Sequence, residues 1–186
     1  MTHAMTKGSL SDLAAQHGGS LAEAFLSADT IILVDTSGSM ASRDGDTQTR
    51  YDRACAELAQ LQANLAGRIA VMAFSTDVKF CPGGVPHYYG LGTDMVKALE
   101  FVRPADGLVD RLILISDGEP DQALATLALA AKFETQIDCI FIGPEVSPGA
   151  DFLRRLAKAS GGTSQAIAQA SLLSERIERL MLAGAA

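Results

Sequence analysis

Apolar residues follow two alternating patterns along this chain of 186 residues. Short runs rich in β-branched residues, bounded by turn residues, predict buried strands, whereas apolar residues spaced three and four apart predict helices. The predicted strands are Ile31–Val34, Arg68–Phe74, Leu112–Ser116, Ile137–Ile142 and a weaker Thr163–Ile167, with a short edge strand at Val78–Cys81.

Helical spacing recurs between these runs. The predicted helices are Arg50–Leu65, Asp94–Val102, Gln122–Phe133, Ala150–Ser160 and a closing helix at Leu172–Leu182. Ser9–Leu26 has the same spacing but contains Gly18-Gly19, which predicts two short helices or one broken helix. The alternation of strands and helices predicts an α/β fold. We expect a doubly wound, mostly parallel central sheet with helices on both faces and one short antiparallel edge strand.

The composition limits which partners and which cellular compartment we expect for this protein. The formal net charge is −7, and Lys and Arg do not cluster, so neither nucleic acid nor an anionic membrane is an expected partner. No apolar run is long enough to span a membrane, and no signal-peptide pattern follows Met1–Lys7, so we expect a cytoplasmic protein. Cys55, Cys81 and Cys139 are expected to be buried free thiols.

Candidate chemistry lies directly after the first predicted strand, in the stretch Asp35-Thr36-Ser37-Gly38-Ser39. Ligands of open α/β sheets bind beyond the carboxyl ends of the strands, which is where this stretch is predicted to lie. A carboxylate and two hydroxyls are hard oxygen donors that suit Mg²⁺ or Mn²⁺ better than zinc or copper. Taken alone, the stretch is equally compatible with a polar turn.

Two later segments carry similar donors. Thr93 lies in the loop Gly90–Asp94 and is predicted to be the N-cap of the following helix or to lie one residue from it. Asp117 directly follows the strand Leu112–Ser116, as Asp35 follows the first strand. Two carboxylates that end neighbouring buried strands would repel each other unless a cation lies between them.

Asp35-Thr36-Ser37-Gly38-Ser39 resembles the D-x-S-x-S motif of the von Willebrand factor type A (VWA) family, and Thr93 and Asp117 are similar to that family's second and third elements. The resemblance extends from Ala28 to Leu182. It implies a Rossmann-like VWA domain at residues 28–186, preceded by an N-terminal helical extension at residues 1–27.

The resemblance also implies a metal-ion-dependent adhesion site. In such a site Ser37 and Ser39 would coordinate the metal through their hydroxyls, while Asp35 and Asp117 would hold metal-bound waters. Thr93 would coordinate it directly or through water. The implied metal is Mg²⁺ or Mn²⁺, ahead of Ca²⁺.

The function implied by this resemblance is non-enzymatic: a partner protein would offer an Asp or Glu carboxylate to the metal. Intracellular bacterial members of the family often act beside AAA+ ATPases of the MoxR type, which implies an adaptor role. Two alternatives stay open. A Mg²⁺-dependent phosphatase of the haloacid-dehalogenase type would need D-x-D, but the second position here is Ser37. An extracellular adhesion domain would be favoured by a signal segment or a disulfide.

Overall fold

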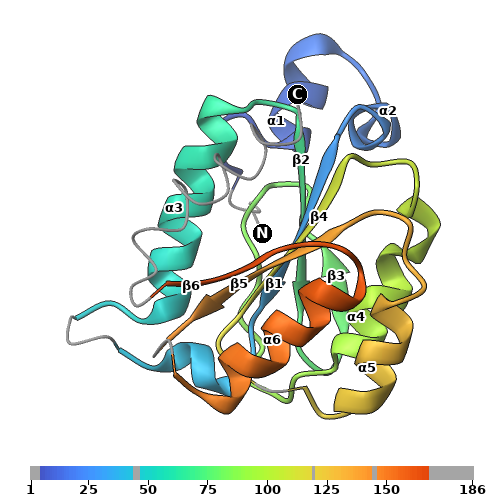
Figure 1. The fold of residues 1–186 in the computed structure, drawn as a ribbon. Helices are drawn as coiled ribbons and strands as arrows, with labels where there is room; N and C mark the ends of the chain where they lie inside the picture. Colours follow the sequence, from blue (N-terminus) through green and yellow to red (C-terminus); the bar gives the residue numbers. More distant parts are fainter. Residues whose placement is uncertain (1–4, 44–46, 119, 144–145, 168–186) are drawn as a thin grey trace.

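The computed structural model describes residues 5–43, 47–118, 120–143 and 146–167, and Figure 1 shows a single sheet with helices packed around it. The strands lie in the order β3-β2-β1-β4-β5-β6, and every neighbouring pair is parallel except β2 and β3. The predicted α/β fold with a short antiparallel edge strand is therefore confirmed. The strands are β1 Thr30–Asp35, β2 Ile69–Phe74, β3 Val78–Phe80, β4 Arg111–Ser116, β5 Ile137–Ile142 and β6 Ser164–Ile167.

Helices cover both faces of the sheet because alternate residues of each strand point to opposite sides. Ile32 and Val34 of β1 join one apolar cluster with the buried side of α3, whereas Ile31 and Leu33 join a second cluster with α4 and α6. Figure 1 shows α3 on one side of the sheet and α4 and α5 on the other. The helices are α1 Leu10–His17, α2 Leu21–Leu26, α3 Arg50–Asn64, α4 Met95–Val102, α5 Ala123–Ala130 and α6 Pro148–Ala159, with 3₁₀ turns η1 Gly38–Ala41 and η2 Arg103–Ala105.

Helix ends differ from the prediction where a capping residue decides them. The N-cap of α4 is Asp94, whose carboxylate accepts from the Lys97 amide at 3.0 Å, so Thr93 lies one residue before the cap. Helix α6 begins two residues earlier than predicted because Ser147 caps it and Pro148 occupies its first position. The predicted helix Leu172–Leu182 lies outside the described residues.

The N-terminal segment forms two short helices, each with a serine N-cap. Most of its apolar residues are not buried: Leu10 is, and Phe25 packs edge to face on Phe80 of β3 at 5.4 Å. The proposed boundary between residues 27 and 28 stays a prediction. No helix in the described ranges is long and apolar enough to cross a membrane.

The three cysteines are free thiols, as predicted, but they are not all buried. Cys81 and Cys139 are buried, whereas Cys55 is only half-buried. In α3, Ala54, Leu58 and Leu61 face the sheet. Cys55 lies about 100° around the helix from Ala54, at the margin of the contact, because an α-helix has 3.6 residues per turn.

Candidate metal site

Asp35 is the last residue of β1 and is completely buried. Its Oδ1 accepts from the Ser37 amide at 2.8 Å, and its Oδ2 accepts from the Ser116 hydroxyl at 2.6 Å. Ser116 ends β4, the parallel neighbour of β1, so the two strands deliver their last side chains to the same edge of the sheet. This contact across 81 residues fixes the carboxylate at the centre of the edge.

Two hydroxyls continue this arrangement toward a second carboxylate. Ser37 Oγ lies 3.2 Å from Ser39 Oγ, which in turn donates to Asp117 Oδ1 at 2.6 Å. The structure therefore brings together four of the five predicted site residues. Neighbouring ligands of an octahedral Mg²⁺ with bonds of roughly 2 Å lie about 3 Å apart, so the hydroxyl pair fits such an ion with little movement.

Asp117 forms an ion pair with Arg50, a residue that was not predicted from the sequence to belong to the site. Arg50 Nη1 lies 2.8 Å from Asp117 Oδ2; the Asp117 side chain is fully buried, and that of Arg50 is 18% exposed. Arg50 is the first residue of α3. A cation is unfavourable at a helix N-terminus, which is the one signal in the sequence that could have drawn attention to it.

The environment of Asp35 works against its ionised form. Burial raises the pKa of this carboxyl to about 6, although the hydrogen bonds from Ser116 and Ser37 oppose the shift. The charge of Asp117 adds a smaller upward contribution to the pKa. A cation near both carboxylates would reverse these effects, because it favours the charged forms.

The loop that contains Thr93 lies against the turn that contains Ser37 and Ser39. The Gly38 amide donates to the Leu91 carbonyl at 3.1 Å, and the Gly90 amide donates to the Thr36 carbonyl at 3.0 Å. Thr93 itself is 7% exposed, and its carbonyl accepts from the Asp121 amide at 3.1 Å. Within the described ranges, no hydrogen bond joins the Thr93 hydroxyl to the other four predicted site residues.

Comparison with known proteins establishes the fold. No protein-family profile matches the sequence, and no curated protein sequence is significantly similar to it. Solved structures do match: BatB from Bacteroides thetaiotaomicron is 18% identical, covering 85% of this chain and 98% of its own, with a TM-score of 0.63. A von Willebrand factor type A protein from Catenulispora acidiphila is 20% identical, covering 83% of this chain and 42% of its own, with a TM-score of 0.59.

The protein has the von Willebrand factor type A fold. Manganese-loaded TRAP protein from Plasmodium vivax is also similar, at 16% identity, 84% coverage of this chain, 74% coverage of its own and a TM-score of 0.60. Because these sequence identities are low, the structural similarity establishes the fold but not a function. In this VWA fold Asp35, at the end of β1, and Asp117, directly after β4, lie at the carboxyl edge of the sheet.

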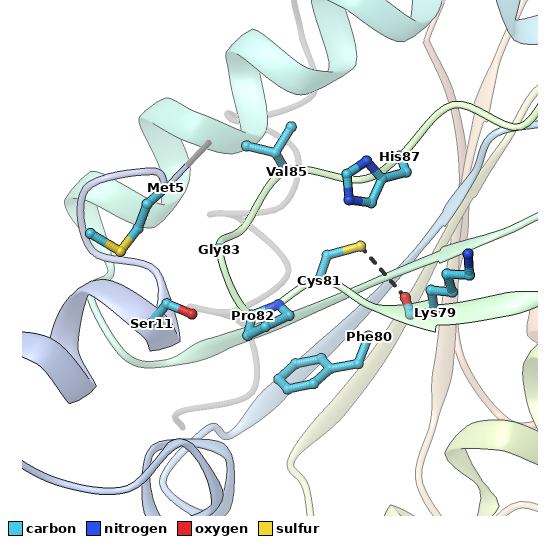
Figure 2. Close-up of a pocket in the computed structure, with 9 residues that line it drawn as sticks. All are labelled: Met5, Ser11, Lys79, Phe80, Cys81, Pro82, Gly83, Val85 and His87. Carbon is cyan, nitrogen blue, oxygen red and sulfur yellow. Dashed lines mark hydrogen bonds between the residues drawn. The ribbon is translucent and has the colours of Figure 1, made fainter. Parts of the chain in front are cut away.

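A hollow of about 490 Å³ beside β3 offers different chemistry (Figure 2). It lies toward the amino end of β2 in the VWA sheet, since the Cys81 amide donates to the Val71 carbonyl. Cys81 lines this hollow, and its Sγ donates weakly to the Lys79 carbonyl at 3.5 Å. Burial raises the pKa of the Cys81 thiol. A protonated thiol is a poor nucleophile, so this hollow does not favour a catalytic cysteine.

Proposed function

We propose that the protein is a divalent-metal-dependent protein-interaction module that binds an acidic residue of a partner protein. The observation that carries this proposal is the pair of hydroxyls, Ser37 and Ser39, set between two buried carboxylates at the carboxyl edge of a VWA fold. Within the described part of the chain, no group of three or more His, Cys, Asp or Glu side chains could hold a metal. A metal at this edge would therefore depend on hydroxyls, as hard ions allow.

When bound, a Mg²⁺ or Mn²⁺ ion would supply a Lewis-acidic position that accepts a carboxylate from outside. Ser37 and Ser39 would hold the ion, because their hydroxyl oxygens are already close together. Asp35 and Asp117 would supply negative charge through their hydrogen-bonded oxygens. Thr93 would add a neutral hydroxyl from a separate loop and would serve the geometry of the partner more than the affinity for metal.

A hydrolytic role for the same residues has less support. A phosphatase of the haloacid-dehalogenase type needs a second carboxyl group two residues after the first, to act as general acid. That position is Ser37, whose amide donates to Asp35. A hydroxyl cannot replace the carboxylic acid in this role near neutral pH, so we propose a binding site and not an enzyme.

The similarity to a structure described as manganese-loaded TRAP supports Mg²⁺ or Mn²⁺ as the ion to test first. A role beside an AAA+ ATPase and a cytoplasmic location stay predictions from the sequence. The partner itself can be sought by comparing proteins retained in Mg²⁺ with those retained in EDTA.

The direct test is the effect of metal on thermal unfolding. A ligand that binds only the folded state at a hundredfold excess over its Kd stabilises it by about 2.7 kcal/mol. Millimolar Mg²⁺ or Mn²⁺ should therefore raise the melting temperature of the wild-type protein relative to EDTA. Ser37→Ala should abolish the rise while the metal-free variant stays folded.

Ser42→Ala is the matched control, because Ser42 is an exposed serine in the same loop region, three residues beyond Ser39. It should respond to metal as the wild type does. If the wild type shows no shift with either ion, the proposed metal dependence is wrong. If Ser37→Ala and Ser42→Ala respond alike, the metal binds elsewhere.

A further inference from the structure

Arg50 occupies a position where the helix itself disfavours a cation. It is the first residue of α3, and the N-cap Thr49 and the N3 residue Asp52 form a reciprocal capping box around it. The N-terminal end of a helix carries a partial positive charge. The Arg50 guanidinium is therefore better accommodated beside an anion, and among the described residues it contacts the buried carboxylate of Asp117 at 2.8 Å.

Both oxygens of Asp117 are occupied by partners within the chain. Oδ1 accepts from the Ser39 hydroxyl at 2.6 Å, and Oδ2 accepts from Arg50 at 2.8 Å. A buried carboxylate without a partner is costly, so the ion pair with Arg50 offsets part of the cost of burying the Asp117 side chain. Of these two carboxylates, Asp117 therefore has an ion-pair partner among the described residues, whereas Asp35 has hydrogen bonds alone.

We propose that Arg50 is an internal counter-cation of the candidate metal site: it holds Asp117 in place, weakens the affinity for a divalent ion, and makes the metal-loaded site more positive than it would be without the guanidinium. This inference rests on the proposed function. Asp35, Asp117 and Arg50 together carry a formal charge of about −1, since two carboxylates are offset by one guanidinium. A divalent ion would change the total to about +1, whereas without the guanidinium it would reach only zero.

This balance bears on the kind of partner that fits. A loaded site that carries one more positive charge attracts a carboxylate more strongly than the same site without that charge. The same guanidinium repels the incoming metal, so affinity for metal is given up in favour of affinity for an anion. Arg50 is thus a positioning residue that acts through Asp117 and through its charge.

Two substitutions separate charge from packing. Arg50→Gln removes the charge, and Arg50→Lys keeps it while losing the planar fork. Arg68→Gln is the matched control, because Arg68 forms an exposed ion pair with Asp29 at 2.6 Å at the other end of β1. Mn²⁺ binding to each full-length protein would be measured by calorimetric titration, and thermal melting would be followed in EDTA and in Mn²⁺.

We expect Arg50→Gln to bind Mn²⁺ about tenfold more tightly than the wild type, because a like charge near the ion has been removed. Its melting temperature in EDTA should fall, since Asp117 is left without its cation, and Mn²⁺ should raise it by more than in the wild type. Arg50→Lys should bind Mn²⁺ within about threefold of the wild type, and Arg68→Gln should match the wild type.

A purely structural role for Arg50 would produce the opposite sign, with both Arg50 variants melting lower and both binding Mn²⁺ more weakly. That result, or equal affinity in Arg50→Gln and wild type, overturns the inference. If Arg50→Gln is unfolded in EDTA, folding on addition of Mn²⁺ supports the inference, and failure to fold under either condition overturns it.

The outcomes also distinguish this inference from the proposed function. If the wild type binds Mn²⁺ but Arg50→Gln binds no more tightly, the inference fails and the proposed function stands. If the wild type does not bind Mn²⁺ but Arg50→Gln does, the guanidinium has replaced the metal; the inference then holds and the proposed function fails. If neither binds, both fail.

Discussion

Asp35 and Asp138 are both fully buried in the same sheet, but they are held in different ways. Asp138 lies near the amino end of β5, where Arg111 Nη1 donates to its Oδ2 at 2.6 Å and the Thr163 amide and hydroxyl donate to its Oδ1, each at 2.8 Å. Asp35 lies at the carboxyl end of β1 and accepts from one amide and one hydroxyl, in the vicinity of another carboxylate.

The difference shows how a buried carboxylate that supports the fold can be distinguished from one that is available to bind a cation. A guanidinium with matching hydrogen bonds offsets the cost of burying Asp138 inside the chain. Asp35 has hydrogen bonds but, among the described residues, no ion pair. Its charged form therefore gains most from an external cation, and this contrast between structural and candidate-site carboxylates can be tested.

The largest expected effect on the free energy of unfolding concerns the ion pair between Arg111 and Asp138. Arg111→Met should lower the free energy of unfolding by about 3–5 kcal/mol, because it leaves Asp138 buried without its partner. Urea unfolding in EDTA and in Mg²⁺ should give the same loss, since this end of the sheet is not expected to bind metal. Arg68→Met, which breaks a more exposed ion pair with Asp29, should cost about 1 kcal/mol or less. A metal-dependent loss in Arg111→Met would break the contrast.

The second effect is the pH dependence of the metal-free protein. Burial raises the pKa of Asp35 from 3.8 to about 6, so its protonated form favours the folded state. This contribution is fully present below pH 3.8 and is lost as the pH rises through 6, a change of about 3 kcal/mol. Urea unfolding in EDTA between pH 4 and 7.5 would measure it, with Asp35→Asn as the reference.

Saturating Mg²⁺ should reverse that trend, because a metal binds the carboxylate and competes with the proton. Its stabilising effect should therefore grow as the pH rises through 6 in the wild type. In Asp35→Asn neither the loss nor the gain should appear. Equal pH profiles for the two proteins in EDTA would show that Asp35 is not the group that titrates.

A smaller effect separates the hydroxyls that serve the two carboxylates. Ser116→Ala removes a hydrogen bond to Asp35 and should cost about 1.5–3 kcal/mol at pH 7.5, with less cost at pH 4.5 where Asp35 is protonated. Thr163→Val removes the hydroxyl at Asp138 but keeps the Thr163 amide and Arg111, so it should cost about 1 kcal/mol at both pH values. Chemical denaturation at the two pH values measures both. A pH-independent cost for Ser116→Ala would contradict the assigned role of Asp35.

The strands were predictable because burial on both faces leaves a plain signal. Ile31–Val34 is an unbroken apolar run and Ile137–Ile142 is apolar except for Asp138, and every residue of β1 and β5 is buried. Helix ends were less predictable, since they depend on which polar side chain turns back to the backbone. Asp94 caps α4, whereas Thr93 beside it was predicted to be the N-cap or to lie one residue from it.

The candidate site was only partly predictable for a different reason. The positions of Asp35 and Asp117 follow from the ends of two strands, and parallel neighbours bring those ends together. The contact of Arg50 with Asp117 depends on where α3 begins relative to a strand 67 residues away, and no local pattern encodes that. Ser116 was visible as the end of β4, but its hydrogen bond to Asp35 depends on a rotamer.

The two hydrogen bonds between the loops at the carboxyl edge have a consequence for the exchange of amide hydrogens with solvent. Gly38 begins the 3₁₀ turn η1 and Gly90 lies in a loop, and the amide of each donates to a carbonyl of the opposite loop. Their exchange with deuterium requires the loops to separate, so both amides report the same local opening. These two glycine amides thus provide a pair of probes for the frequency with which this edge opens.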